Sequence, residues 1–186
     1  ATVSTSPTMI YFGQEVGEPG AEDAGFGDPS RTSIFDYIGV PQHQKWMNGG
    51  KFDGGQLSDN EKALRNYYSE VLNFTRNSPA LMGEYLELHT FNRHENPDYT
   101  NKTFAYARWD ESQKLIVVAN FDMRLEIKTV LKLSPDLLDS WSLELGEKEI
   151  LEVMFGKKKT MLRVTKDGAE IDLELGPLES AVFEIN

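Results

Sequence analysis

Leu115-Ile116-Val117-Val118-Ala119-Asn120-Phe121 is the clearest strand in the second half of this 186-residue sequence. It is a short run of apolar, partly β-branched residues, and similar apolar or alternating segments recur before and after it. The segments lie at 84–91, 103–109, 114–121, 126–133, 141–145, 149–154, 160–165, 169–175 and 179–185. Many short strands at this spacing predict an antiparallel sandwich or barrel. Asp167-Gly168 predicts a tight hairpin, because both residues tolerate the positive φ angles of such a turn.

The first half of the sequence has a different pattern. Residues 8–12, Thr-Met-Ile-Tyr-Phe, are apolar on both faces of the pleat, which predicts a strand buried on two sides, as in a parallel sheet. Such a strand needs neighbours. Residues 13–57 follow with ten of the fifteen glycines and several aromatic residues, which favours a folded functional loop over a disordered linker.

A helix is predicted after this loop. Ser58 and Glu61 form a capping-box signature, and Pro79 ends the helix. Apolar and semipolar residues between them recur at the spacing of one helical face: Leu64, Tyr67, Tyr68, Val71, Leu72 and Thr75.

Composition excludes several functional classes. The formal net charge of −11 argues against a nucleic-acid partner, because a polyanion would be repelled. The absence of cysteine excludes disulfides, thiolate catalysis and cysteine zinc sites. No apolar stretch is long enough to predict a membrane span. The sequence opens without an initiator methionine or a signal-peptide pattern, so we expect it to be part of a longer protein.

Several motifs occur in an order that resembles the alpha-amylase family, glycoside hydrolase family 13. In the first half they are Pro7-Thr8-Met9-Ile10-Tyr11-Phe12-Gly13-Gln14-Glu15-Val16-Gly17, Gly27-Asp28-Pro29-Ser30-Arg31, Leu64-Arg65-Asn66-Tyr67-Tyr68 and Arg76-Asn77-Ser78-Pro79-Ala80-Leu81-Met82-Gly83. In the second half they are Phe104-Ala105-Tyr106-Ala107-Arg108, Leu115 to Phe121, and Leu175-Gly176-Pro177-Leu178-Glu179-Ser180-Ala181-Val182-Phe183.

The resemblance implies a mixed fold with two parts. Residues 1–83 would be the final strand, a long loop and the final helix of a catalytic (β/α)8 barrel. Residues 84–186 would be an all-β, Greek-key antiparallel sandwich. The opening strand would then pair with a strand outside this sequence, either in the remainder of the enzyme or in a swapped copy of the chain.

The implied activity is retaining hydrolysis or transfer at α-1,4-glucosidic bonds of starch or maltooligosaccharides. The catalytic carboxylates of the family lie on earlier barrel strands, so no catalytic residue is expected in this chain and the fragment alone should be inactive. No cofactor or metal site is predicted here, although calcium is compatible with the full-length protein. The resemblance favours an extracellular or periplasmic location, and an α-glucan as partner.

The candidate substrate-binding residues each have a functional and a structural interpretation. Asp28 and Arg31 either bind sugar hydroxyls or pair with each other across the loop. They are three positions apart, whereas the family resemblance leads us to expect four, and this difference argues against direct contact of Arg31 with the sugar. Trp46 either stacks on a glucose ring or anchors the loop by packing. Glu15 either lies near the sugar or, as the favoured interpretation, is a buried carboxylate that holds the loop.

Two alternatives to an active hydrolase remain open from the sequence. The chain could be a non-catalytic carbohydrate-binding or adhesion β-sandwich module, since fold does not dictate function. It could also belong to a catalytically inactive member of the family.

Overall fold

The structure is a computed structural model that describes residues 3–19, 39–156 and 158–185. Contacts divide the chain into two compact units, one containing Ser6–Arg76 and the other containing Val3–Thr5 and Asn77–Asn186. The assignment of 1–83 to a barrel and 84–186 to a sandwich stays a prediction.

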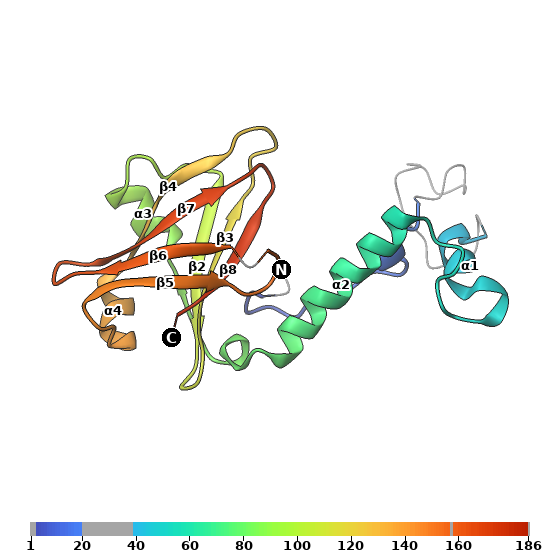
Figure 1. The fold of residues 1–186 in the computed structure, drawn as a ribbon, viewed down its shortest axis with the longest axis horizontal. Coiled ribbons are helices and arrows are strands. Elements are labelled where there is room, and N and C mark those ends of the chain that lie inside the picture. Colours follow the sequence, from blue (N-terminus) through green and yellow to red (C-terminus); the bar gives the residue numbers. More distant parts are fainter. Residues whose placement is uncertain (1–2, 20–38, 157, 186) are drawn as a thin grey trace. The chain divides into compact units, whose positions relative to one another are not determined.

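The second unit is built on an antiparallel sheet whose strands curl around a common core (Figure 1). Its strands are β1 (Glu84–Glu87), β2 (Thr103–Trp109), β3 (Lys114–Asn120), β4 (Ile127–Leu133), β5 (Gly146–Glu152), β6 (Lys159–Val164), β7 (Ala169–Leu175) and β8 (Ser180–Glu184). Its helices are η3 (Pro79–Met82), α3 (His89–Glu95) and α4 (Pro135–Trp141).

The strand order confirms the antiparallel all-β prediction. The eight strands form one sheet in the order β1-β2-β3-β8-β5-β6-β7-β4. Within it, β8-β5-β6-β7 has the spatial order of a Greek key, three consecutive strands with the fourth beside the first. Only two residue pairs join β5 to β8, Leu151 with Glu184 and Glu152 with Phe183, so the sheet folds at this junction. This arrangement is compatible with a β-sandwich.

The core lies between the two halves of the curled sheet. Ile116 and Val118 from β3 and Phe183 from β8 belong to the same buried cluster as Ile171 and Leu173 from β7. Alternating residues of β7 face this cluster, which is the period-two pattern of a strand with one face buried. The second faces of β2 and β3 are buried as well, which explains their continuous apolar runs.

Three sequence predictions in this unit need correction. Residues 141–145 are not a strand: Trp141 ends α4, is buried, and packs its ring edge-on against Trp109 with ring centroids 5.8 Å apart. The segment 84–91 is a strand only to Glu87, since α3 begins at His89. The β6–β7 hairpin is confirmed, but Gly168 has no positive φ. The register pairs Val164 with Ala169, and the Thr165 N–H donates to the Gly168 carbonyl at 2.8 Å, so Lys166 and Asp167 are the central residues of the turn and Gly168 is not.

In the first unit, the predicted helix is confirmed as α2 (Asp59–Asn77). Its capping box is formed: Glu61 accepts a hydrogen bond from the Ser58 N–H at 2.6 Å, and the Glu61 N–H donates to the Ser58 hydroxyl at 3.3 Å. The other described elements of this unit are η1 (Gln14–Val16), α1 (Pro41–Met47) and η2 (Asn48–Gly50).

The strand predicted at 8–12 is not formed in this chain. Residues 8–12 have no regular structure, and Met9 is 84% exposed. A strand is stabilised by hydrogen bonds to neighbouring strands, and the first unit has none among its described residues. The prediction of a buried, paired strand is therefore wrong for this chain by itself.

Candidate functional site

The loop from Gly13 to Glu18 has a tight backbone that two glycines make possible. Gly13 and Gly17 have φ angles of 79° and 70°, in the left-handed region that disfavours side chains. The turn of η1 lies between them, and the Glu18 N–H donates to the Gly13 carbonyl at 2.9 Å. A Cβ atom at Gly13 would lie 2.4 Å from the Cβ of Glu18, so this position leaves no room for a side chain.

The carboxylate of Glu18 holds helix α1 against this loop. Its Oε2 accepts hydrogen bonds from the backbone N–H of His43 at 3.0 Å and lies 3.1 Å from Nδ1 of the same residue. The Phe12 ring stacks on the imidazole with ring centroids 4.2 Å apart and an interplanar angle of 7°. The Glu18 side chain is only 3% exposed, and its Oε1 has no hydrogen-bond partner among the described residues.

Trp46 lies half-buried at the edge of a pocket of 350 Å³ in the first unit. The guanidinium of Arg65, on α2, lies over the indole at 5.3 Å from the ring centroid. The Phe52 ring packs edge-on with a centroid separation of 5.7 Å. Trp46 is therefore packed on more than one side, which is the geometry of an anchor, while stacking on a sugar stays a prediction.

A second ion pair joins α1 to the start of α2. The Lys45 ammonium contacts Oε1 of Glu61 at 2.9 Å. This hydrogen bond, together with those from Ser58, lowers the pKa of Glu61 to about 2. One carboxylate thus caps α2 and ties α1 to it.

Of the predicted site residues, Glu15 and Trp46 lie in the part of the chain that the structure describes. Glu15 is partly exposed on η1, and the buried acid that holds the loop is Glu18. The signal for Glu18 was the pair of glycines just before it, because such backbone geometry brings residue 18 back onto residue 13. Asp28 and Arg31 lie outside the described residues, so their roles stay predictions.

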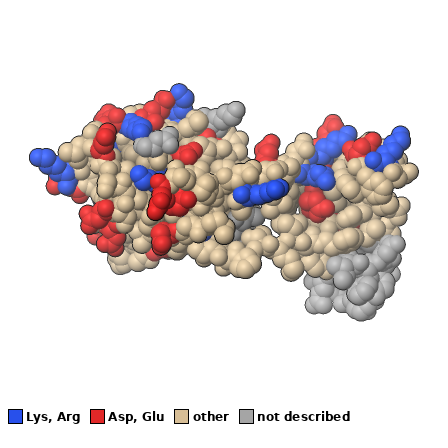
Figure 2. All heavy atoms as spheres, turned by 90° about the horizontal axis from the view of Figure 1, so that it is seen from below, with Lys and Arg blue, Asp and Glu red and all other residues tan. Residues whose placement is uncertain are grey.

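Figure 2 shows Lys and Arg side chains lying among Asp and Glu side chains, with no large basic patch on the face shown. Over residues 3–19, 39–156 and 158–185, no group of three His, Asp or Glu side chains is placed to hold a metal ion. Within the same residues, no helix is both long and apolar enough to cross a membrane.

Comparison with known proteins supports the resemblance at the level of fold. No protein-family model matches the sequence, and no curated protein sequence matches it. The structure of AmyP in complex with maltose matches 98% of this chain with 13% identity and a TM-score of 0.59, over 32% of its own length. The alpha-amylase from Geobacillus thermoleovorans, complexed with acarbose, matches 99% with 15% identity and a TM-score of 0.55, over 31% of its length.

The chain therefore shares the fold of part of an alpha-amylase, which agrees with the family resemblance found in the sequence. The chain spans about a third of the length of each solved structure.

Proposed function

We propose that this chain is the C-terminal part of a retaining α-glucan hydrolase that acts on α-1,4-glucosidic bonds of starch or maltooligosaccharides. Residues 1–83 would complete a (β/α)8 barrel, and residues 84–186 would form the sandwich domain beside it. The observation that carries the proposal is the match of nearly the whole chain to about a third of two alpha-amylase-family structures.

Uncovered apolar surface in the first unit supports the proposal. Helix α2 carries an apolar stripe, yet Val71 is its only buried residue. Tyr67 and Leu72 from that stripe are 50% and 40% exposed, and Met9 in the opening segment is 84% exposed. Exposed apolar faces of this kind are usually covered by another part of a protein. The rest of a barrel would supply both that cover and the neighbouring strands that residues 8–12 need.

In the proposed mechanism, the remainder of the barrel supplies the catalytic carboxylates and this chain supplies residues that bind the substrate. Two carboxyl groups on earlier strands would act as nucleophile and as acid/base through a covalent glycosyl intermediate. In this chain, Asp28 and Arg31 would bind sugar hydroxyls on the loop, and Trp46 would line the same cleft. Glu18 and His43 would keep the start of that loop fixed, because their hydrogen bonds join residues 25 apart in the sequence.

A reducing-sugar assay on soluble starch tests this proposal. We expect no hydrolysis by the 186-residue chain and hydrolysis by the longer protein that contains it. Hydrolysis by the chain alone would contradict the assignment of the catalytic carboxylates to the missing part. A longer protein that binds starch without cleaving it would favour the binding-module or inactive-homologue alternatives.

The proposed binding role of Asp28 is tested in the longer protein. Asp28→Ala removes a charged hydrogen-bond acceptor, so we expect kcat/KM for maltooligosaccharides to fall by roughly tenfold or more. Glu22→Ala, in the same acidic loop, is the matched control and should leave kcat/KM unchanged. Equal effects of the two substitutions would mean that loop charge, and not contact by Asp28, matters for activity.

A further inference from the structure

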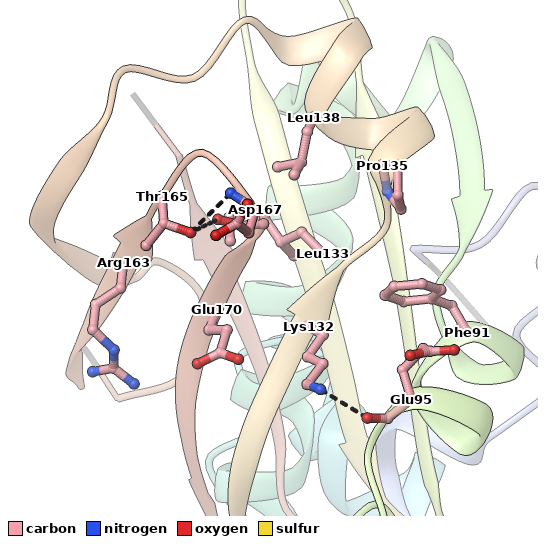
Figure 3. Close-up of a pocket in the computed structure, with 12 residues that line it drawn as sticks. Phe91, Glu95, Lys132, Leu133, Pro135, Leu138, Arg163, Thr165, Asp167 and Glu170 are labelled. Carbon is pink, nitrogen blue, oxygen red and sulfur yellow. Dashed lines mark hydrogen bonds between the residues drawn. The ribbon is translucent and has the colours of Figure 1, made fainter.

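A separate pocket of 360 Å³ opens on the sheet unit between α3, α4 and the β6–β7 turn (Figure 3). One wall is apolar and comes from Phe91, Leu133, Pro135 and Leu138. The remaining lining includes charged side chains, namely Glu95, Lys132, Arg163, Asp167 and Glu170. A volume above about 300 Å³ is within the range of small-molecule sites.

Glu170 lies at the centre of the charged part of this pocket. In the sheet register it faces Lys132 on β4 and Arg163 on β6, so the three side chains share one face. Figure 3 shows the Glu170 carboxylate lying between the two basic side chains. This order of charges would ordinarily produce two cross-strand ion pairs.

Neither of these cross-strand pairs forms, because both cations are held elsewhere. The Lys132 ammonium donates to the backbone carbonyl of Glu95 at 2.7 Å. The Arg163 guanidinium forms a bidentate pair with Asp172, with Nη1 donating to Oδ2 at 2.8 Å. Among the described residues, the Glu170 carboxylate makes no hydrogen bond or ion pair within 4 Å, although its charge, after that of Asp172, helps to raise the pKa of Arg163. The pocket therefore contains the Glu170 carboxylate as a hydrogen-bond acceptor, with one fixed cation on each side of it.

The charge balance and the apolar wall define the class of ligand. The lining carries three carboxylates and two cations, so it offers little net attraction to a phosphate or a metal cation. Alternating donors and acceptors suit a neutral ligand with adjacent hydroxyl groups. The Phe91 ring and the aliphatic side chains beside it suit the C–H face of a sugar ring.

We propose that this pocket is a non-catalytic oligosaccharide-binding site on the sheet unit. Glu170 accepts from one sugar hydroxyl, Lys132 donates to a neighbouring one, and Phe91 contacts the ring face. The choice of an α-glucan as the oligosaccharide rests on the proposed function. Such a site would hold a polymeric substrate on the enzyme away from the point of cleavage.

The test is a titration of the full 186-residue chain with maltotriose, followed by backbone amide NMR. We expect saturable shifts in the amides of Thr165 to Ala169, which form the turn at the pocket mouth. Glu170→Ala should raise the Kd measured from these shifts by about tenfold, because it removes the charged acceptor. Phe91→Leu, which keeps the apolar bulk of the wall, should raise the Kd by a smaller factor.

Glu174→Ala is the matched control. Glu174 lies on the same strand, faces Lys128 in the same register, and is outside this pocket. It should leave the Kd for maltotriose unchanged. The inference is overturned if maltotriose does not shift these amides, if Glu170→Ala binds like the unmodified chain, or if both alanine variants lose affinity equally. Equal Kd values for the β-linked cellotriose would overturn the assignment to an α-glucan.

The outcomes separate this inference from the proposed function. Starch cleavage by the longer protein, with maltotriose binding unaffected by Glu170→Ala, would refute the pocket alone. Pocket-dependent binding of maltotriose without starch cleavage by the longer protein would refute the proposed hydrolase and leave the binding site in place.

Discussion

The side-chain amide of Asn92 pairs with both backbone groups of Lys132. Its Oδ1 accepts from the Lys132 N–H at 2.8 Å, and its Nδ2 donates to the Lys132 carbonyl at 2.8 Å. Lys132 lies on β4, which ends the order of the described strands. At the C-cap of α3, Asn96 Nδ2 donates to the Val130 carbonyl at 2.6 Å. Helix α3 therefore satisfies an edge that would otherwise be open to pairing with another chain.

Replacing Asn92 should destabilise the sheet unit. Asn92→Ala removes two long-range hydrogen bonds from a fully buried side chain and leaves the β4 groups without partners. We expect the free energy of unfolding to fall by about 2–3 kcal/mol in chemical denaturation. Asn73→Ala is the control, because Asn73 is exposed and bonds only to Ser69 in its own helix. Similar losses for the two variants would argue against a role of α3 at the sheet edge.

Arg108 is a buried cation that binds backbone carbonyls from two separate segments. It is 2% exposed and donates to Leu81 O at 2.5 Å, Ser4 O at 2.8 Å and Glu84 O at 3.0 Å. Leu81 and Glu84 lie just before β1 and at its first residue, and Ser4 lies near the start of the chain. Arg108 thus fixes both segments to β2.

We expect Arg108→Met to lower the free energy of unfolding by about 3 kcal/mol or more, because several buried carbonyls lose a charged donor. A Glu-specific protease should also cleave faster after Glu84, since that segment loses its attachment. Arg124→Met, at an exposed position, should change neither quantity. Unchanged cleavage after Glu84 in the Arg108 variant would show that other contacts hold the segment.

Strand positions in the sheet unit could be read from the sequence because periodicity reports burial. β2 and β7 begin and end at the predicted residues, since one is apolar on both faces and the other alternates strictly. Helix α4 was missed because Trp141, Leu143 and Leu145 alternate like a strand. The Ser134-Pro135 pair before the helix was the competing start signal.

The contacts of the candidate site and of the sheet edge could not be predicted from the periodicity of the sequence. Hydrogen bonds such as that between Asn92 and Lys132, 40 residues apart, leave no local pattern. The apolar run at 8–12 has a strand pattern, but periodicity does not show whether neighbouring strands are present. Glu18 is one of several acidic residues between positions 18 and 28, and nothing in the sequence distinguishes it from Glu22 or Asp23, although its contact with His43 sets it apart in the structure.

Gly13→Ala should disturb the Glu18–His43 contact. The new Cβ would meet Glu18 Cβ at 2.4 Å and His43 Cε1 at 3.0 Å, at a φ of +79°. We expect faster hydrogen exchange at the His43 amide, which donates to Glu18. Gly49→Ala is the control that separates backbone strain from steric contact. Gly49 has a φ of +65°, but nothing lies within 4 Å of its added Cβ. Equal exchange at His43 in both variants would mean that steric contact at Gly13 is unimportant.

Asp122 should make the stability of the sheet unit dependent on acid pH. The Lys102 ammonium donates to its Oδ2 at 2.8 Å, and the N–H groups of Arg124 and Leu125 donate to its Oδ1 at 2.8 Å and 3.1 Å. These hydrogen bonds lower the pKa of Asp122 to about 2, the contact with Lys102 having the largest effect. The unfolded chain protonates an aspartate near pH 3.9, at about the ordinary value.

Because the folded pKa is the lower one, the stabilisation by ionised Asp122 is fully present above about pH 4 and is lost as the pH falls toward 2. Asp122→Asn should therefore lower the free energy of unfolding most above pH 4, and its difference from the unmodified chain should shrink toward pH 2. Denaturation curves at several pH values measure this difference. Glu111→Gln, at an exposed position, is the control and should show little difference throughout. A difference for Asp122→Asn that stays constant from pH 5 to pH 2 would mean that the charge on Asp122 does not stabilise the fold.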